Sequence, residues 1–216
     1  MTPRRSSHTS LGSKAFDGAA LPSGLDLGRR VVIANVWPSL DDRAFAIKRV
    51  EGDRLEVWAD ILADGHDLLA AVLRVRPAGS QTWLESPMRE LDNDRWSGSV
   101  ELGPPGRYLV GIQAWVDRFG SWRRELRARL DAGQDVASAM SQGRAIVEEL
   151  LGGDLDRSQV RAWLDLWGDQ ADGPSCALSD EFKALLDSYD QRAHASVLEP
   201  EIIVQVDRQR AAWGAW

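Results

Sequence analysis

Apolar and polar residues alternate along two neighbouring stretches of this chain. Apolar or small residues take every second position in residues 96–101 and 107–116, and the turn-forming sequence Gly-Pro-Pro-Gly fills positions 103–106 between them. A period of two indicates strands with one buried face, and a short turn between two such runs is typical of an antiparallel hairpin. We therefore expect a hairpin here, within a β module that binds or scaffolds.

Earlier runs show the same alternation. Strand patterns occupy residues 31–33, 55–61, 68–75 and 82–91, and polar or Gly/Pro-containing turns separate the last three. The spacing predicts that 68–75 runs back as the partner of 55–61. Several short strands with turn residues between them favour a β-sandwich.

The period changes after residue 119. Apolar residues then recur three or four positions apart, which predicts about four amphipathic helices joined by short loops. Strand alternation returns at 202–206, and one strand needs partners to be stable. We therefore expect a mixed β plus α fold: an immunoglobulin-like antiparallel β-sandwich with an inserted bundle of about four helices before the last strand.

This pattern divides the chain into four parts. They are a disordered basic tail (1–29), a β-sandwich (30–120 and 197–207), an inserted helical subdomain (121–196) and the start of a connection to a further domain (208–216). The tail is rich in Ser, Gly and Ala and shows no periodicity. Trp213 and Trp216 close the chain, and we expect them to pack against the domain that follows.

Bulk composition excludes several classes of function. The net charge of −7 gives no excess of positive charge for nucleic acid. No apolar run approaches the roughly 20 residues of a membrane span. Cys176 is the single cysteine, so no internal disulfide can form, which fits a reducing cytoplasm.

Candidate chemistry within the chain is sparse. His66 lies between Asp64 and Asp67, but Asp-Gly-His-Asp is more simply a turn than a metal site. Cys176 has no histidine nearby in the sequence, so an inert thiol is the default interpretation. We expect no catalytic, cofactor-binding or metal-binding residues.

An ordered series of short motifs resembles the N-terminal region of the bacterial maltosyltransferase that uses maltose 1-phosphate to extend α-1,4-glucans, a member of glycoside hydrolase family 13. The resemblance covers residues 30–216 and is dense as far as Val136. The motifs are Lys48-Arg49-Val50, Gly52-Asp53, Ala59-Asp60-Ile61, Asp64-Gly65-His66-Asp67, Pro87-Met88, Asn93-Asp94-Arg95-Trp96, Pro105-Gly106-Arg107-Tyr108, Ala114-Trp115-Val116-Asp117-Arg118-Phe119, Trp122-Arg123, Ala132-Gly133-Gln134-Asp135-Val136 and Gly214-Ala215-Trp216.

The resemblance implies a supporting role for this segment. In the family a sandwich with inserted helices contributes to a homodimer interface, and the final Gly-Ala-Trp leads into a catalytic (β/α)8 barrel. Such a barrel takes about 250 residues, and retaining transfer needs two carboxyl groups about 5–5.5 Å apart. The barrel cannot fit beside the assigned elements, so maltose 1-phosphate and α-1,4-glucan are expected as substrates of the parent enzyme only. Trp58 departs from the family pattern, in which a carboxylate is more usual.

Apolar side chains supply the candidate contact residues. We expect self-association or interdomain contact through Trp122, Leu126, Val136, Met140, Val147, Trp213 and Trp216. Trp58 and Trp115 lie opposite the apolar faces of their strands, so each either packs against a neighbouring domain or stacks on a sugar. Two alternatives remain open: a glucan-binding module that uses Trp58 or Trp115, and a stand-alone interaction protein.

Overall fold

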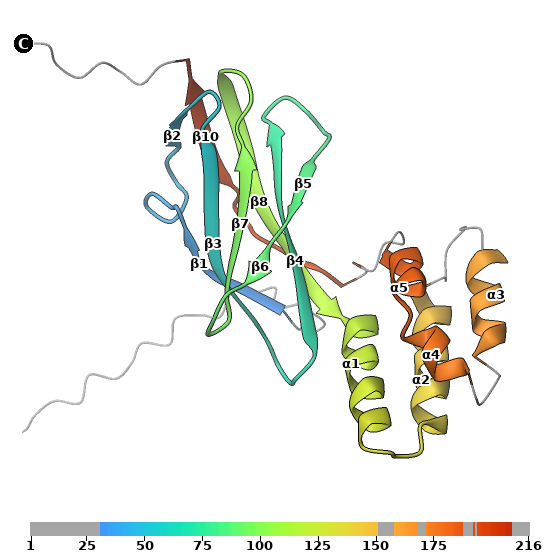
Figure 1. Cartoon of the computed structure of the whole chain (residues 1–216). Coiled ribbons are helices and arrows are strands. Elements are labelled where there is room, and N and C mark those ends of the chain that lie inside the picture. The colour runs from blue at the N-terminus through green and yellow to red at the C-terminus, as the bar shows by residue number, and fades with distance from the viewer. Residues whose placement is uncertain (1–30, 151–157, 168–171, 188–191, 193, 209–216) are drawn as a thin grey trace, which may run out of the picture.

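A β-sandwich and a helical layer make up the protein. The computed structural model describes residues 31–150, 158–167, 172–187, 192 and 194–208. The helical layer lies beyond one end of the sandwich, where the chain leaves the sheets (Figure 1). The predictions for the basic tail, for the terminal connection and for Trp213 and Trp216 fall outside the described residues.

Two sheets form the sandwich. The four-stranded sheet has the order β1 (Val31–Trp37), β3 (Arg54–Ala63), β7 (Arg95–Glu101) and β6 (Arg89–Glu90). The six-stranded sheet has the order β2 (Ile47–Val50), β10 (Ile202–Asp207), β8 (Gly106–Asp117), β4 (Leu68–Pro77) and β5 (Leu84–Pro87), and β9 (Ser196–Val197) also pairs with β8.

The alternating residues form the core between the sheets, as predicted. Leu55, Val57 and Ile61 of β3 are completely buried, and so are Val110 and Ile112 of β8. Burial of this apolar surface is the main favourable term that holds the two sheets together.

The predicted hairpin between 96–101 and 107–116 is wrong. These strands are β7 and β8, and they belong to different sheets, so residues 102–105 carry the chain across the core as an arch. The Tyr108 hydroxyl donates to the Pro104 carbonyl at 2.8 Å and fixes this crossing. The apolar faces of β7 and β8 therefore point into the core from opposite sheets instead of lying side by side in one sheet.

The pairing predicted between 55–61 and 68–75 is wrong for the same reason. β3 lies in the four-stranded sheet and β4 in the six-stranded sheet. The expected strand at 82–91 divides as well. β5 pairs with β4, whereas β6 pairs with β7 in the other sheet, and the buried Met88 lies between β5 and β6.

The return of the chain to the sandwich confirms that the helices are an insertion. β10 pairs antiparallel with β8, where Val204 faces Tyr108, and parallel with β2, where Val204 faces Ile47. The sheet is therefore mixed and not purely antiparallel. The parallel pair arises because β10 enters the sheet after a long excursion, which frees its direction from the hairpin constraint.

Five helices lie in the described part of the insertion, one more than predicted, and they precede two strands instead of one. They are α1 (Arg118–Asp131), α2 (Ala137–Leu150), α3 (Ser158–Leu166), α4 (Gly173–Ala177) and α5 (Asp180–Asp187). The additional helix is α4, which begins with Gly173 and Pro174, because proline is compatible with a first helical turn. α1 begins three residues before the expected boundary because Asp117 caps it, accepting from the Gly120 amide at 2.7 Å.

Aromatic side chains form a second core within the helical layer. Trp122 stacks on Trp167 with ring centroids 5.2 Å apart, and Phe119 meets Phe182 edge to face at 5.7 Å. Gly143 of α2 lies directly against Trp122, and a Cβ atom at that position would be 2.1 Å from Cζ2 of the indole. The α1–α2 contact therefore requires a residue without a side chain at position 143.

Substitution of Gly143 tests this contact. We expect Gly143→Ala to lower the free energy of unfolding by about 2 kcal/mol in urea titrations, because overpacking outweighs the higher helix propensity of alanine. Gly79→Ala is the matched control, since nothing lies within 4 Å of its Cβ position. A gain in stability for Gly143→Ala would contradict the packing described.

Candidate functional site

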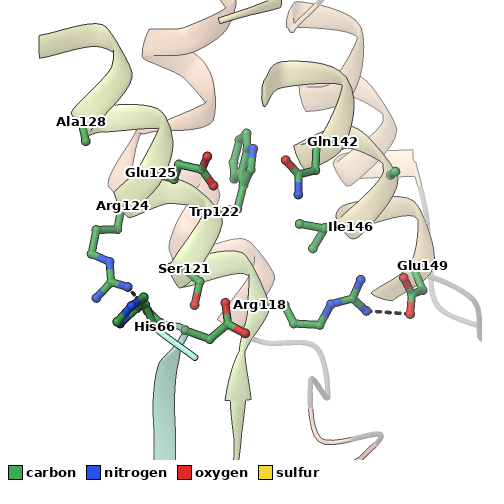
Figure 2. A pocket seen from close by; sticks show the side chains of 12 residues that line it. His66, Arg118, Ser121, Trp122, Arg124, Glu125, Ala128, Gln142, Ile146 and Glu149 are labelled. Carbon is green, nitrogen blue, oxygen red and sulfur yellow. Dashed lines mark hydrogen bonds and ion pairs between the residues drawn. The ribbon is translucent and has the colours of Figure 1, made fainter. Parts of the chain in front are cut away.

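A groove of about 730 Å³ opens where the helical layer meets the sandwich. Its walls come from the turn between β3 and β4, from one face of α1 and from one face of α2 (Figure 2). We call it the junction groove, and its principal lining residues are His66, Arg118, Arg124, Glu125, Ala145 and Glu149.

Hydrogen bonds fix α1 to the sandwich at the base of this groove. The Ser121 hydroxyl donates to the Asp117 carbonyl at 2.7 Å and accepts from the Leu68 amide at 2.6 Å. The Arg124 guanidinium donates to the His66 carbonyl. Side chains of α1 thus hold backbone groups at the start of β4, so the helical layer has a defined orientation relative to the sheets.

An ion pair bridges the two helices across the groove. Arg118 Nη1 lies 2.7 Å from Glu149 Oε1 (Figure 2). The hydrogen bond lowers the pKa of Glu149 and raises the pKa of Arg118. Both side chains are about half exposed, so the pair orders the rim of the groove more than it stabilises the fold.

The floor and rims of the groove differ in chemistry. Trp122 closes the floor, and its indole Nε1 donates to the Ala139 carbonyl at 2.7 Å. Ala128 of α1 and Ala145 of α2 are exposed on the rims. These short side chains leave room for another surface to approach the two helix backbones closely.

Five of the residues predicted for self-association or interdomain contact lie inside the helical layer. Trp122, Leu126 and Val147 are buried in its core, and Val136 and Met140 pack partly buried against that core. Their helical spacing arises because they face neighbouring helices of the same chain.

Trp58 and Trp115 have different surroundings. Trp58 points outward from the four-stranded sheet, as the alternation predicts, and is 37% exposed. Trp115 lies on β8 of the other sheet, half-buried, with the Arg192 guanidinium 4.8 Å from its ring centroid. Arg192 also pairs with Glu85 at 2.8 Å, so one face of the Trp115 ring already has a partner within the chain.

Trp37 is a surface residue that sequence reasoning missed. It lies opposite Trp58 across β1 and β3, with ring centroids 5.7 Å apart and ring planes at 48°. The register shifts between Ala34 and Trp37, and Asn35 has a φ of 48°. An asparagine inside the run Val-Val-Ile-Ala-Asn-Val-Trp was the available signal, since asparagine tolerates the left-handed conformation of a bulge.

Asp60 lies next to the two tryptophans on the same outer face. Its Oδ2 accepts from Asn35 Nδ2 at 2.7 Å, and its Oδ1 accepts from Arg95 Nε at 3.1 Å. The Asn35 hydrogen bond, followed by that of Arg95, holds the pKa of Asp60 below its ordinary value.

The other residues considered as metal ligands are not clustered in the described part of the chain. No group of three or more His, Cys, Asp or Glu side chains within the described ranges is placed to hold a metal ion. His66 is exposed on the turn, as a turn residue would be. None of the helices that the structure describes combines the length and hydropathy needed to cross a membrane.

The fold and the junction groove define a class of protein: a two-sheet β module with a helical insertion hydrogen-bonded to one end. Residues 29–208 match the family model described as α-1,4-glucan:maltose-1-phosphate maltosyltransferase, domain N/S. The chain therefore belongs to this domain N/S family.

Three maltosyltransferases of the same description support this assignment. The chain is 38% identical over 87% of its length to the maltosyltransferase of Chlorobaculum tepidum. It is 37% identical over 86% of its length to that of Myxococcus xanthus and 33% identical over 87% to that of Salinibacter ruber. The alignments cover 29%, 30% and 28% of these relatives, so the chain spans less than a third of their length.

Removal of the Asn35 side chain tests the hydrogen bonding around Asp60. We expect Asn35→Ala to raise the pKa of Asp60 towards the ordinary 3.8, because the largest cause of its depression is lost. Carboxyl-carbon NMR titration measures this directly. Since a depressed pKa stabilises the fold above the unfolded-state pKa, the stability gap between wild type and variant should narrow as the pH falls through the folded-state pKa of Asp60.

Asn93→Ala is the matched control. Asn93 has a φ of 49°, close to the 48° of Asn35, so both variants carry a similar backbone penalty. An equal pKa of Asp60 in wild type and Asn35→Ala would show that the hydrogen bond does not hold the carboxylate.

Proposed function

We propose that this chain is the N-terminal scaffolding and dimerisation segment of a maltosyltransferase. The parent enzyme would transfer a maltosyl unit from α-maltose 1-phosphate to the non-reducing end of an α-1,4-glucan. One observation carries the proposal. Residues 29–208 match the domain N/S family model, and the region that aligns with the Chlorobaculum tepidum relative is only 29% of that relative's length. The chemistry would lie in the remaining part of the parent, and this segment would orient that part.

The junction supports a scaffolding role. Two separate cores would move freely if only a loop joined them. Here β8 continues directly into α1, and Ser121 and Arg124 bind the backbone at the start of β4 and in the turn before it. A module with a fixed angle between its layers can hold a neighbouring catalytic domain, or a second copy, in one orientation.

The junction groove is the surface that we assign to self-association. A two-fold dimer uses the same patch on both copies, so that patch must complement itself. The groove carries both signs of charge, with Arg118 and Arg124 near Glu125 and Glu149, and it carries short alanines on both helices. Opposite charges on one patch can pair across a two-fold axis, and alanines permit close approach of the helices.

A charge placed on the α2 rim tests this surface. We expect Ala145→Arg to raise the dimer dissociation constant at least about tenfold, because the long arginine side chain blocks the close approach of the helices that the short alanines permit. Size-exclusion chromatography with light scattering gives the mass across a concentration series.

Ala162→Arg is the matched control. Ala162 is exposed on α3, which does not line the groove, and the substitution changes helix propensity and charge equally. A monomeric wild-type chain, or a dimer that Ala145→Arg leaves intact, would contradict dimerisation through this groove.

A further inference from the structure

A β-bulge determines which face of the four-stranded sheet carries Trp37. Before the bulge, even-numbered residues of β1 point outward, since Val32 is exposed and Val31 is buried. The extra residue at Asn35 reverses this parity, so Val36 is buried and Trp37 points outward. Without the bulge, regular alternation would turn Trp37 towards the core. Bulges are retained where they re-aim a side chain, often beside functional sites.

The re-aimed ring completes a surface that we call the aromatic platform: Trp37 and Trp58, with Asn35, Asp60 and Arg95 beside them. Trp37 is 54% exposed, a large value for the largest apolar side chain. Ser97 faces Trp58 from the neighbouring strand β7, and its short side chain covers less of the indole than a large residue would. The two indoles therefore present adjacent apolar faces to solvent.

The helices that the structure describes leave this face uncovered. They lie beyond the end of the sandwich where β8 passes into α1 (Figure 1). Large exposed aromatic groups that lie together usually mark a contact with another molecule.

We propose that the aromatic platform binds an α-1,4-glucan chain. This inference rests on the proposed function, because it names a second place at which the glucan-extending parent would hold its polymer. A sugar ring offers an apolar C–H face together with hydroxyl groups, so it requires aromatic rings with hydrogen-bonding groups at their edges. Trp37 and Trp58 supply the rings, and Asp60 and the half-exposed Arg95 supply an acceptor and donors.

The charges and the shape of the platform favour this ligand. Asp60 and Arg95 neutralise each other at 3.1 Å, so the surface beside the rings suits an uncharged ligand better than a phosphate or an acidic peptide. The two ring planes are inclined by 48°, which makes a bent surface. α-1,4 linkages curve a glucan, whereas β-1,4 linkages leave it flat, so the platform should prefer the α-linked chain.

Calorimetric titration of the 216-residue chain with maltoheptaose tests the proposal, with cellohexaose as the flat comparison. We expect millimolar binding of maltoheptaose and no detectable heat from cellohexaose. Trp58→Ala and Trp37→Ala should each weaken binding about tenfold, the effect expected on loss of one aromatic contact. Trp83→Ala is the control, because it removes a tryptophan that lies under Arg74 and Arg76, next to the six-stranded sheet.

Three results would overturn the proposal. They are no maltoheptaose binding, binding that survives both Trp37→Ala and Trp58→Ala, and a dimer that becomes monomeric on Trp58→Ala. The last result would identify the platform as a contact between protein copies. If the chain dimerises through the junction groove but does not bind maltoheptaose, only the proposal of glucan binding at the aromatic platform is contradicted. The scaffolding proposal is unaffected by that result.

Discussion

The register of strand β8 is the constraint on which the rest of the structure depends. β8 lies between β4 and β10, and its inward residues supply part of the sandwich core. Its last residue, Asp117, faces Leu68 in the pairing with β4 and also caps α1. A slip of one residue would turn the buried face outward and would rotate the helical layer, so pairing and burial together determine where the junction groove lies.

The same arrangement explains how an insertion of about 80 residues leaves the sandwich intact. The chain departs at Asp117 and returns at Ser196, which pairs with Ala114 of the same strand. Ser196 is buried, and its hydroxyl donates to the Val31 carbonyl of β1 in the opposite sheet. The ends of the insertion are therefore held close together, and the helical layer can form its own aromatic core without straining the sheets.

The sequence predicted the longer strands, their buried positions and the insertion, but not the short strands β2 and β9 or which strands are neighbours. Alternation reports which face of a strand is buried, and that face is the same in a hairpin and in an arch. The prediction that β7 and β8 form a hairpin is therefore wrong, although Trp96 and Val110 are in the core as expected. Helical spacing has a similar ambiguity: Leu126 and Val147 pack inside their own layer, and a stripe that contacts a second copy would have the same spacing. Trp37 could not be placed from periodicity because a bulge breaks the period.

The proposed role places the chemistry in another part of a longer parent enzyme, and phosphate release from maltose 1-phosphate tests this most directly. The 216-residue chain would be incubated with the donor and maltoheptaose, beside the longer Chlorobaculum tepidum relative, of which the matched region is 29%. We expect inorganic phosphate from the longer protein and none from the 216-residue chain. Phosphate release by the 216-residue chain alone would contradict the claim.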